Sequence, residues 1–499
     1  MAKLRKAAAD FTAAIQQAAI CHQRGQLADA ERLYTRVLAA APDHFDALHL
    51  LGVLRQQQGR SVEALRLIAA ALKRNADSVD ALSNHGVVLD ALTRHEEAVA
   101  SYDRALALMP GRADVLGNRG NALLALGRDA EALASYEQAL ALRPAFAQAL
   151  SNRGRALANL GRNAEAVESF DRALALKPDD VAALALRGNA LFQLERHAEA
   201  LASYDAALAI EPNAARVLNN RGYALLALAR LDEALASYQA ALALDPDYAE
   251  ALVNCGNVLG ALDCYEDADR HYDQALVIEP ALAEAKWNKS LLHLSRGRFA
   301  DGWPLYEQRW LGGIKGAVPR GYPQPRWNGE HMRGTLLVWG EQGLGDQILH
   351  AGMIPELAGR AGAVVLEVEP RLVDLFARSF PGVSIVPLAP DLFAGPLDAH
   401  VPIGSLGAYL RPDWQAFRPR AYLVADRSRA DALRARLKHD GHTVVGLSWR
   451  SVAPLIGKSK SAQLTDFAEV LRMPGCRFVD LQYGDTRADR ERLERELGV

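Results

Sequence analysis

The sequence predicts an α-helical solenoid of paired helices followed by an α/β domain built on a parallel sheet. The first observation is a unit of 34 residues, clearest from Val79 to Arg112, which its neighbours repeat at the same spacing. The second is the loss of this period from Ala317, in a segment rich in proline. The third is the remaining chain, where short apolar runs alternate with helical stretches, a pattern typical of α/β proteins.

Glycine and proline each recur at a fixed place in the 34-residue unit. The glycines are Gly52, Gly86, Gly120, Gly154, Gly188, Gly222 and Gly256. The prolines are Pro42, Pro110, Pro144, Pro178, Pro212, Pro246 and Pro280. A period near 34 residues with this pattern is typical of the tetratricopeptide (TPR) repeat, a helix–turn–helix unit. Over about three fifths of its length the chain therefore resembles the TPR family.

The pattern also has a physical basis that is independent of any family. Two helices that share an apolar seam need small residues where they cross, and the repeated glycine supplies one. A second set of glycines falls between the paired helices, where a left-handed residue ends the first helix; it comprises Gly25, Gly59, Gly127, Gly161 and Gly297. The proline ends the second helix. Each pair leaves an apolar face that its neighbour covers, so the units stack.

The predicted boundaries follow from these periodicities. They are an N-terminal tail over 1–10, nine TPR-like repeats forming a superhelix over 11–316, a proline-rich linker over 317–334, a first Rossmann-like half over 335–430 and a partial second half over 431–499. The ninth repeat is a modified cap, because Gly302 replaces the recurrent alanine and Ile314 stands where proline is expected.

Six apolar runs are expected to be strands of the α/β region. They are LLVWG, AVVLEV, SIVPL, YLVAD, VVGLSW and RFVDLQYG. The last two are the convincing strands of the second half, which is too short to complete a doubly wound sheet. We therefore expect that half to look incomplete, with an exposed edge at RFVDLQYG.

Composition excludes several classes of function. The net charge is −3 with no basic stripe, which argues against a nucleic-acid partner. The four cysteines form no CxxC pair or metal-type cluster, as is usual in a reducing cytoplasm, where we expect the protein to reside. The N-terminus lacks the apolar core of a signal peptide. No apolar run approaches the roughly 18 residues of a membrane span.

An asparagine column precedes the repeated glycine by two residues, and it is the candidate peptide-binding feature. Its members are Asn84, Asn118, Asn152, Asn220, Asn254 and Asn288. Amide side chains offer a donor and an acceptor to an extended peptide backbone. The column resembles the asparagine ladder of O-GlcNAc transferase, which implies a protein substrate facing the inside of the superhelix. The alternative is that each asparagine bonds within its own repeat.

A glycine-rich turn, TLLVWGEQGLGDQILHAG, is the candidate chemical site. Gly343 and Gly345 allow a ligand to approach the backbone between a strand and a helix, and Asp346 falls at the helix start. The structural alternative is an ordinary turn in which Asp346 caps the helix.

The surrounding residues extend this interpretation. The stretch from EQGLGD to VEPRLVDLF, followed by VVGLSWRS, Lys460 and FVDLQYG, resembles the heptosyltransferase-like glycosyltransferases of GT-B fold. The resemblance implies that Asp346 is the base and that Gly343, Gly345 and Lys460, or Lys458 in its place, contact the donor. Transfer would need neither a metal nor any cofactor beyond the nucleotide-sugar substrate.

Two features depart from that family. Ala462 and Gln463 stand where it has tryptophan and proline, and its nucleotide-binding segments mostly lie beyond Val499, so we expect poor sugar transfer. In PLDAHVPIGSL, Asp398 and His400 are expected in a loop near the cleft, with His400 as a candidate acceptor-site residue. The ordinary interpretation of a single histidine is a loop or core residue.

Two functions are consistent with these patterns. The preferred hypothesis is a TPR-guided glycosyltransferase, whose superhelix recruits a protein acceptor for transfer from a nucleotide sugar. The alternative is a non-enzymatic TPR scaffold with a degenerate or truncated α/β domain. The weak motifs after Ser448 favour the scaffold, and the intact GEQGLGD stretch favours the enzyme.

Overall fold

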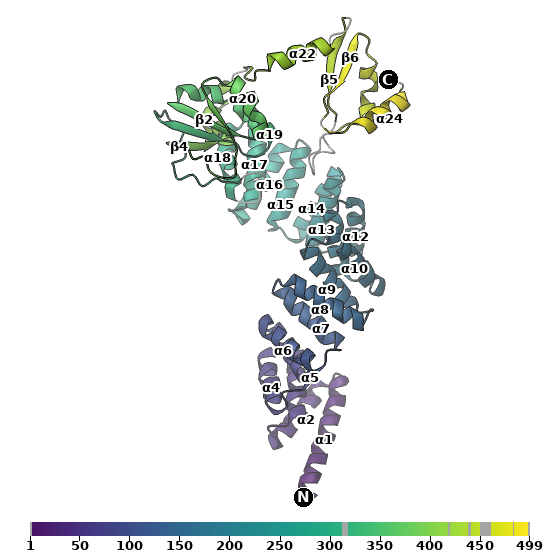
Figure 1. Ribbon diagram of the computed structural model, residues 1–499. Helices are drawn as coiled ribbons and strands as arrows, with labels where there is room; N and C mark the ends of the chain where they lie inside the picture. The colour runs from purple at the N-terminus through teal and green to yellow at the C-terminus, as the bar shows by residue number, and fades with distance from the viewer. Residues whose placement is uncertain are drawn as a thin grey trace. The chain divides into compact units, whose positions relative to one another are not determined.

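The computed structural model describes residues 2–311, 318–417, 420–437, 441–449, 461–482 and 484–497. The chain divides into two compact units, Met1–Leu228 and Ala229–Val499. The first unit is helical, and the second contains further helices and all the strands (Figure 1).

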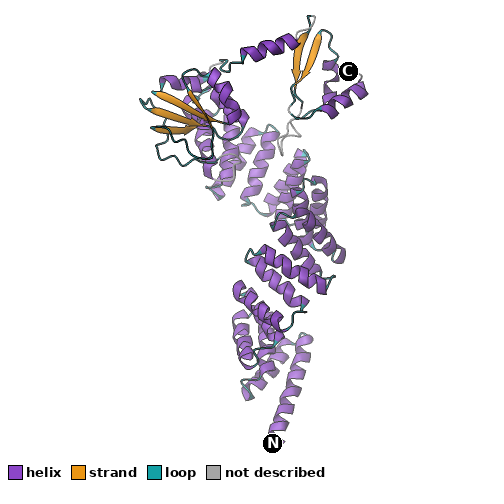
Figure 2. Cartoon of the chain, viewed as in Figure 1, coloured by secondary structure: helices purple, strands orange, loops and turns teal. Residues whose placement is uncertain are grey.

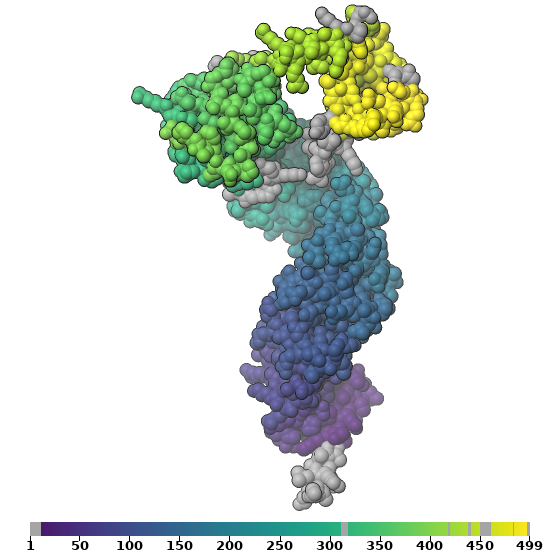
Figure 3. All heavy atoms as spheres, in the orientation of Figure 1, coloured from purple at the N-terminus to yellow at the C-terminus, as the bar shows by residue number. Residues whose placement is uncertain are grey.

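The described residues of the first unit form thirteen helices, of which the first twelve make consecutive antiparallel pairs. They are α1 (Ala2–Gln23), α2 (Leu27–Ala40), α3 (Phe45–Gln57), α4 (Ser61–Arg74), α5 (Val79–Ala91), α6 (His95–Leu108), α7 (Ala113–Ala125), α8 (Asp129–Leu142), α9 (Ala147–Asn159), α10 (Asn163–Leu176), α11 (Val181–Gln193), α12 (His197–Ile210) and α13 (Ala215–Ala227). In the space-filling view these helices form a continuous layered stack (Figure 3). Helix α1 begins at Ala2, so the residues expected as a tail belong to the first helix.

The repeated glycine sets how closely the two helices of a pair approach. A methyl group at Gly120 would lie 2.6 Å from Cε1 of Tyr136, and one at Gly154 would lie 2.7 Å from Cε1 of Phe170. Both rings are fully buried. Since such short contacts cannot form, a side chain at the glycine would force the helices apart.

The turn inside each pair requires a left-handed residue. Gly127 has φ +70° there, as the sequence predicted for the glycine set. Two residues other than glycine hold the same position in this unit, Thr93 with φ 58° and Glu195 with φ 59°. The turn geometry is therefore kept even where the residue does not favour it.

The first helices of successive pairs lie against one another in this unit. Contacts join α5 with α7, α7 with α9, α9 with α11, and α11 with α13. No comparable contact joins successive second helices in the described residues 2–228. The first helices, which carry the asparagine column, thus contact one another from repeat to repeat.

The second unit begins with the last repeat helices. These are α14 (Leu231–Leu244), α15 (Ala249–Ala261), α16 (Tyr265–Ile278), α17 (Ala283–Ser295) and α18 (Phe299–Tyr306), followed by the 3₁₀ turn η1 (Glu307–Leu311). Helix α18 is short and contains Pro304, so the ninth pair is modified as predicted. The described residues up to Leu311 thus form eighteen α-helices, thirteen in the first unit and five in the second.

A four-stranded parallel sheet follows the repeats (Figure 2). Its strands are β1 (Thr335–Trp339), β2 (Ala363–Val368), β3 (Ser384–Pro387) and β4 (Ala399–Pro402), in the order β3-β2-β1-β4. The connecting elements are α19 (Leu344–Ala351), η2 (Ile354–Gly359), η3 (Pro370–Leu372), α20 (Val373–Ser379), η4 (Ile403–Ser405), α21 (Leu406–Leu410) and η5 (Trp414–Ala416).

Each face of this sheet has its own core. Leu336 and Val338 of β1 pack with Ile354 and Phe376 of the connecting helices. Leu337 and Trp339, which point to the other face, pack with Tyr322 of the proline-rich segment. The period of two residues along β1 therefore divides its side chains between two separate cores.

The described part of the proline-rich segment, from residue 318 on, contains no helix, and it covers a sheet edge. The Trp327 amide donates to the His400 carbonyl at 2.9 Å, and the His400 amide donates to the Pro325 carbonyl at 3.1 Å. Because an edge strand otherwise exposes unpaired backbone groups, this segment completes the sheet beside β4.

A second, smaller sheet lies nearer the C-terminus. It pairs β5 (Thr443–Leu447) with β6 (Cys476–Asp480) in parallel, and its helical elements are α22 (Arg427–Leu437), η6 (Leu464–Phe467), α23 (Ala468–Leu471) and α24 (Arg487–Leu497). Strand β6 pairs on one side only within the described residues, in agreement with the expected edge at RFVDLQYG.

One expected strand is absent. YLVAD has no strand pairing, because the Tyr422 hydroxyl donates to the Ile348 carbonyl and the Val424 amide donates to the Ser379 hydroxyl. Side-chain contacts to two helices thus replace a sheet ladder in this segment.

The left-handed turns give the first prediction. We expect Thr93→Gly to raise the free energy of unfolding by roughly 1 kcal/mol, because it removes the strain of a β-branched residue at φ 58°. Thermal unfolding followed by circular dichroism would measure the change. The matched control, Gly127→Thr, should lower stability, and a lower melting temperature for Thr93→Gly would contradict the prediction.

Candidate functional site

The central feature of the α/β region is a network of polar contacts at the carboxyl ends of β1 and β4. The chain passes from β1 to β2 on one side of β1 and returns to place β4 on its other side. The order of strands reverses between β1 and β4, and open α/β sheets usually bind ligands at such a point. Glu341 follows β1 there, and Ser405 follows β4.

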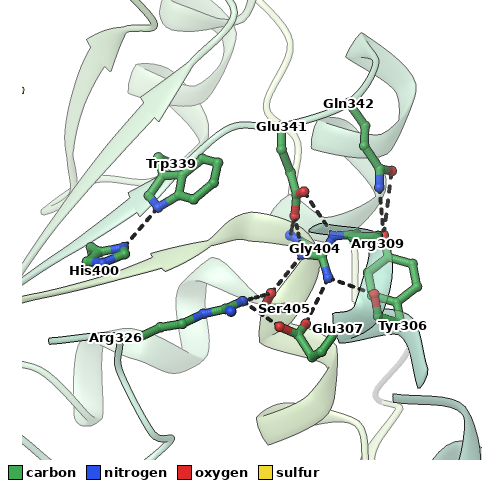
Figure 4. A network of polar contacts seen from close by, with 10 residues as sticks. All are labelled: Tyr306, Glu307, Arg309, Arg326, Trp339, Glu341, Gln342, His400, Gly404 and Ser405. Carbon is green, nitrogen blue, oxygen red and sulfur yellow. Dashed lines mark hydrogen bonds and ion pairs between the residues drawn. The ribbon is translucent and has the colours of Figure 1, made fainter. Parts of the chain in front are cut away.

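The side chain of Arg309, from the end of the repeats, lies at the centre of this network (Figure 4). It is completely buried, and its Nη2 and Nε donate to the two carboxylate oxygens of Glu341 at 2.6 and 3.0 Å. The Nη2 group also donates to the Ser405 hydroxyl at 2.8 Å. Burial acts to lower the pKa of Arg309, but the bonds to Glu341 outweigh it and the pKa is raised.

A second pair of charges extends the network. The Glu307 carboxylate accepts from Arg309 Nη1 at 2.9 Å and also pairs with Arg326. Burial acts to raise the pKa of Glu307, but the two arginines hold it below its usual value. Arg326 donates to the Ser405 hydroxyl at 2.7 Å as well. Two of the chain's own guanidinium groups therefore lie at the carboxyl ends of β1 and β4.

Asp346, the predicted base, lies at the third position of α19. Its Oδ2 accepts from the Gly343 amide at 3.0 Å, and the side chain is exposed. The capping alternative from the sequence therefore describes this contact, because an acidic residue at this position reaches back to the backbone before the helix. Around Gly345 the space is open, since a methyl group there would meet no atom within 4 Å.

His350 lies one helical turn after Asp346, and the sequence analysis did not single it out. Burial lowers the pKa of His350 to about 4, against the opposing effect of Asp346. The spacing of four residues in GDQILH is the signal that could have identified the pair, because such residues share one face of a helix. The imidazole is therefore neutral near pH 7.

His400 lies in β4 and not in the expected loop. Its side chain is buried, and Trp339 Nε1 donates to its Nδ1 at 3.2 Å. Burial lowers its pKa. The nearby Asp398 carboxylate accepts from the Thr335 amide at 2.7 Å. The loop prediction was wrong because a four-residue strand with a central histidine has no clear apolar alternation.

The remaining predicted donor residues cannot be placed. Lys458 and Lys460 lie outside the described residues. Within the described ranges, no group of three histidine, cysteine, aspartate or glutamate side chains is arranged to hold a metal ion. Nor does any described helix have the length and apolar character needed to cross a membrane.

The asparagine column pairs between repeats. Asn152 Nδ2 donates to the Asn121 side-chain oxygen at 2.7 Å, and Asn220 donates to Asn189 at 2.9 Å. In the second unit, Asn288 donates in the same way to Asn257 at 2.8 Å. Each partner lies 31 residues earlier, in the preceding repeat. Bonding within one repeat, the alternative that the sequence offered, therefore does not describe these three residues.

The other members of the column differ. Asn84 Nδ2 lies 2.9 Å from His49 Nε2, also of the preceding repeat, and Asn254 is 1% exposed. Asn118 is partly buried, and no hydrogen bond of its side chain is found among the described residues.

The partner asparagines were missed from the sequence. Asn121, Asn189 and Asn257 directly follow the repeated glycine in alternate repeats, and that alternation was the available signal. Their oxygens also accept from buried tyrosines, as from Tyr136 at 2.8 Å.

Comparison with known families defines the class. The description "Tetratricopeptide repeat" matches residues 22–83, 77–145 and 118–181, and "TPR repeat" matches residues 188–229 and 224–263. The N-terminal half of the chain therefore consists of TPR repeats, which indicates a role in protein interaction.

Individual relatives share part of the chain. Protein FlbA of Caulobacter vibrioides is 33% identical over 233 residues, which are 42% of this chain and 39% of FlbA. The chain thus spans about two fifths of the length of that relative. Among solved structures, YrrB, a TPR protein with an unusual peptide-binding site, is 26% identical with a TM-score of 0.35, covering 40% of this chain and 99% of YrrB. A tetratricopeptide repeat protein from Parabacteroides merdae is 20% identical with a TM-score of 0.40, covering 50% of this chain and 98% of that protein.

The polar network around Arg309 gives the second prediction. We expect Arg309→Met to lower stability by about 3–5 kcal/mol, because Glu341 is left buried without its partner. Denaturant unfolding followed by tryptophan fluorescence would measure it. The double variant Arg309→Met with Glu341→Met should recover much of the loss, and Arg434→Met, at the exposed pair with Asp431, should change little. Equal losses in the single and double variants would contradict this account.

Proposed function

We propose that this protein holds an extended polypeptide along its asparagine column. The supporting observation is that Asn152 and Asn220 use their amide nitrogens to reach the preceding repeat. Fixed in this way, each side chain keeps an oxygen that can accept a backbone N–H from a bound chain. Because the asparagine amide would contact the backbone of the bound polypeptide, binding would not depend on the sequence of that polypeptide.

The arrangement of the first helices also favours this role. Helices in contact lie roughly 8–10 Å apart, and an extended chain rises about 3.3 Å per residue. One repeat therefore corresponds to roughly three residues of bound chain. Asn118, whose amide has no described partner, offers both a donor and an acceptor between its neighbours.

Sugar transfer to the bound polypeptide is the second candidate, with a nucleotide sugar as donor. It is favoured by the glycine-rich turn at the end of β1, where Gly345 is open to approach and the Asp346 carboxylate is exposed. In this scheme Asp346 takes the proton of the acceptor, and Gly343, Lys460 and Lys458 contact the donor without a metal. The alternative remains a scaffold without enzymatic activity.

Column variants test the first proposal. Replacing Asn118, Asn152 and Asn220 together with alanine should weaken binding of reduced, carboxymethylated lactalbumin, an extended polypeptide probe. Each lost bond should cost on the order of 1 kcal/mol, or about fivefold in affinity. Fluorescence anisotropy of the labelled probe would measure the change.

The matched control removes the bonds between repeats and keeps the column. Asn121→Ala with Asn189→Ala should lower thermal stability and retain most of the affinity for the probe. Unchanged affinity in the triple column variant would disprove the proposed role of these amides.

Nucleotide-sugar binding tests the second candidate. If it is correct, calorimetric titration with UDP- and ADP-linked sugars should detect a donor, and Asp346→Asn should reduce transfer about 10²-fold with donor affinity kept. Full turnover in Asp346→Asn would leave the residue as a helix cap only. The absence of any donor binding would favour the scaffold.

A further inference from the structure

A pocket lies where the last repeat meets helix α19. This pocket has a volume of about 460 Å³, within the roughly 300–1,000 Å³ range of ligand sites. Leu294, Phe299 and Trp303 line it from the repeat side. Met353 and Tyr422 are among the residues lining it from the α/β side. The walls are thus mainly apolar and aromatic.

The polar groups of the pocket are few and differ in charge state. Arg411 is buried, and its charge is matched by Glu356, with two bonds at 2.6 and 3.1 Å. His350 is neutral near pH 7, since burial lowers its pKa to about 4. Arg420 is exposed and makes no ion pair with any described residue. Arg420 is therefore the cation that this pocket can offer to a ligand.

Large apolar side chains are exposed at the same place. Leu349 is 71% exposed and Phe417 is 42% exposed, and both line the pocket. Trp414, 65% exposed, contacts the ring of Phe417. A contiguous apolar surface rimmed by a charge is typical of a binding site.

We propose that this pocket binds the C-terminal residue of a polypeptide, with an aromatic or branched side chain against the apolar walls and the terminal carboxylate on Arg420. The neutral His350 imidazole supplies a further hydrogen bond at the wall. The exposed Asp346 carboxylate, one turn before His350, disfavours a second negative charge at that end and so orients the carboxylate toward Arg420. The identity of the ligand rests on the proposed polypeptide binding; the pocket itself does not.

Small probes test the pocket without a partner protein. N-acetyl-L-phenylalanine should bind the full chain, as detected by ligand-observed NMR, and its amide should bind about fivefold more weakly, the effect of one exposed charge pair. Arg420→Gln should abolish this preference for the acid over the amide. Leu349→Glu places a negative charge at the mouth of the pocket. It should therefore weaken binding of the acid more than binding of the amide.

Two exposed residues outside the pocket serve as controls. Arg378→Gln and Leu481→Glu should leave binding of both probes unchanged. Equal binding of acid and amide, no binding of either, or unchanged binding in Arg420→Gln and Leu349→Glu would overturn the proposal. Tighter binding of octanoate than of the acetylated amino acid would also overturn it, in favour of a fatty acid.

The two proposals fail separately. If the triple asparagine variant loses lactalbumin binding but still binds N-acetyl-L-phenylalanine, both proposed sites are supported. Probe binding without any effect of the column variants would sustain the pocket and disprove the column.

Discussion

The buried ion pair between Arg309 and Glu341 is the constraint on which the α/β region depends. A guanidinium and a carboxylate, both removed from water, are tolerated because each satisfies the other through two hydrogen bonds. Glu341 also accepts from the Gly404 amide at 3.1 Å, which ties the ends of β1 and β4 together. The last repeat and the sheet are thus joined through one network, and removing either charge would leave the other unpaired.

This constraint changes where a ligand should be sought. An open parallel sheet ordinarily binds ligands at the carboxyl ends of its strands at the switch point, but here the buried Arg309 contacts Glu341 and Ser405 there. The groups that remain accessible lie on α19, namely the exposed Asp346 and the wall of the pocket at His350. Any chemistry at the glycine-rich turn would therefore take place beside the network of Arg309, Glu341 and Ser405.

In the helical part, hydrogen bonds between repeats connect each helix pair to the next. The glycine–aromatic contact fixes each pair, as at Gly120 and Tyr136, while the Asn152–Asn121 bond connects one pair to the next. Under the proposed polypeptide binding, the same amide that couples two repeats would use its oxygen to accept a hydrogen bond from the bound chain. The nitrogen of the side chain would then connect two repeats, and its oxygen would contact the bound polypeptide. For this reason the partner asparagines, such as Asn121, make a matched control.

Local patterns in the sequence determined the helix pairs, the left-handed turns and the change to an α/β region. A period of 34 residues and an alternation of two residues act over short distances, so they can be read without coordinates. Tertiary structure decided the rest. Arg309 meets Ser405 across 96 residues, Asn152 meets Asn121 across 31, and His400 is enclosed between elements far apart in the chain. Such contacts depend on how the elements pack, which no local pattern encodes.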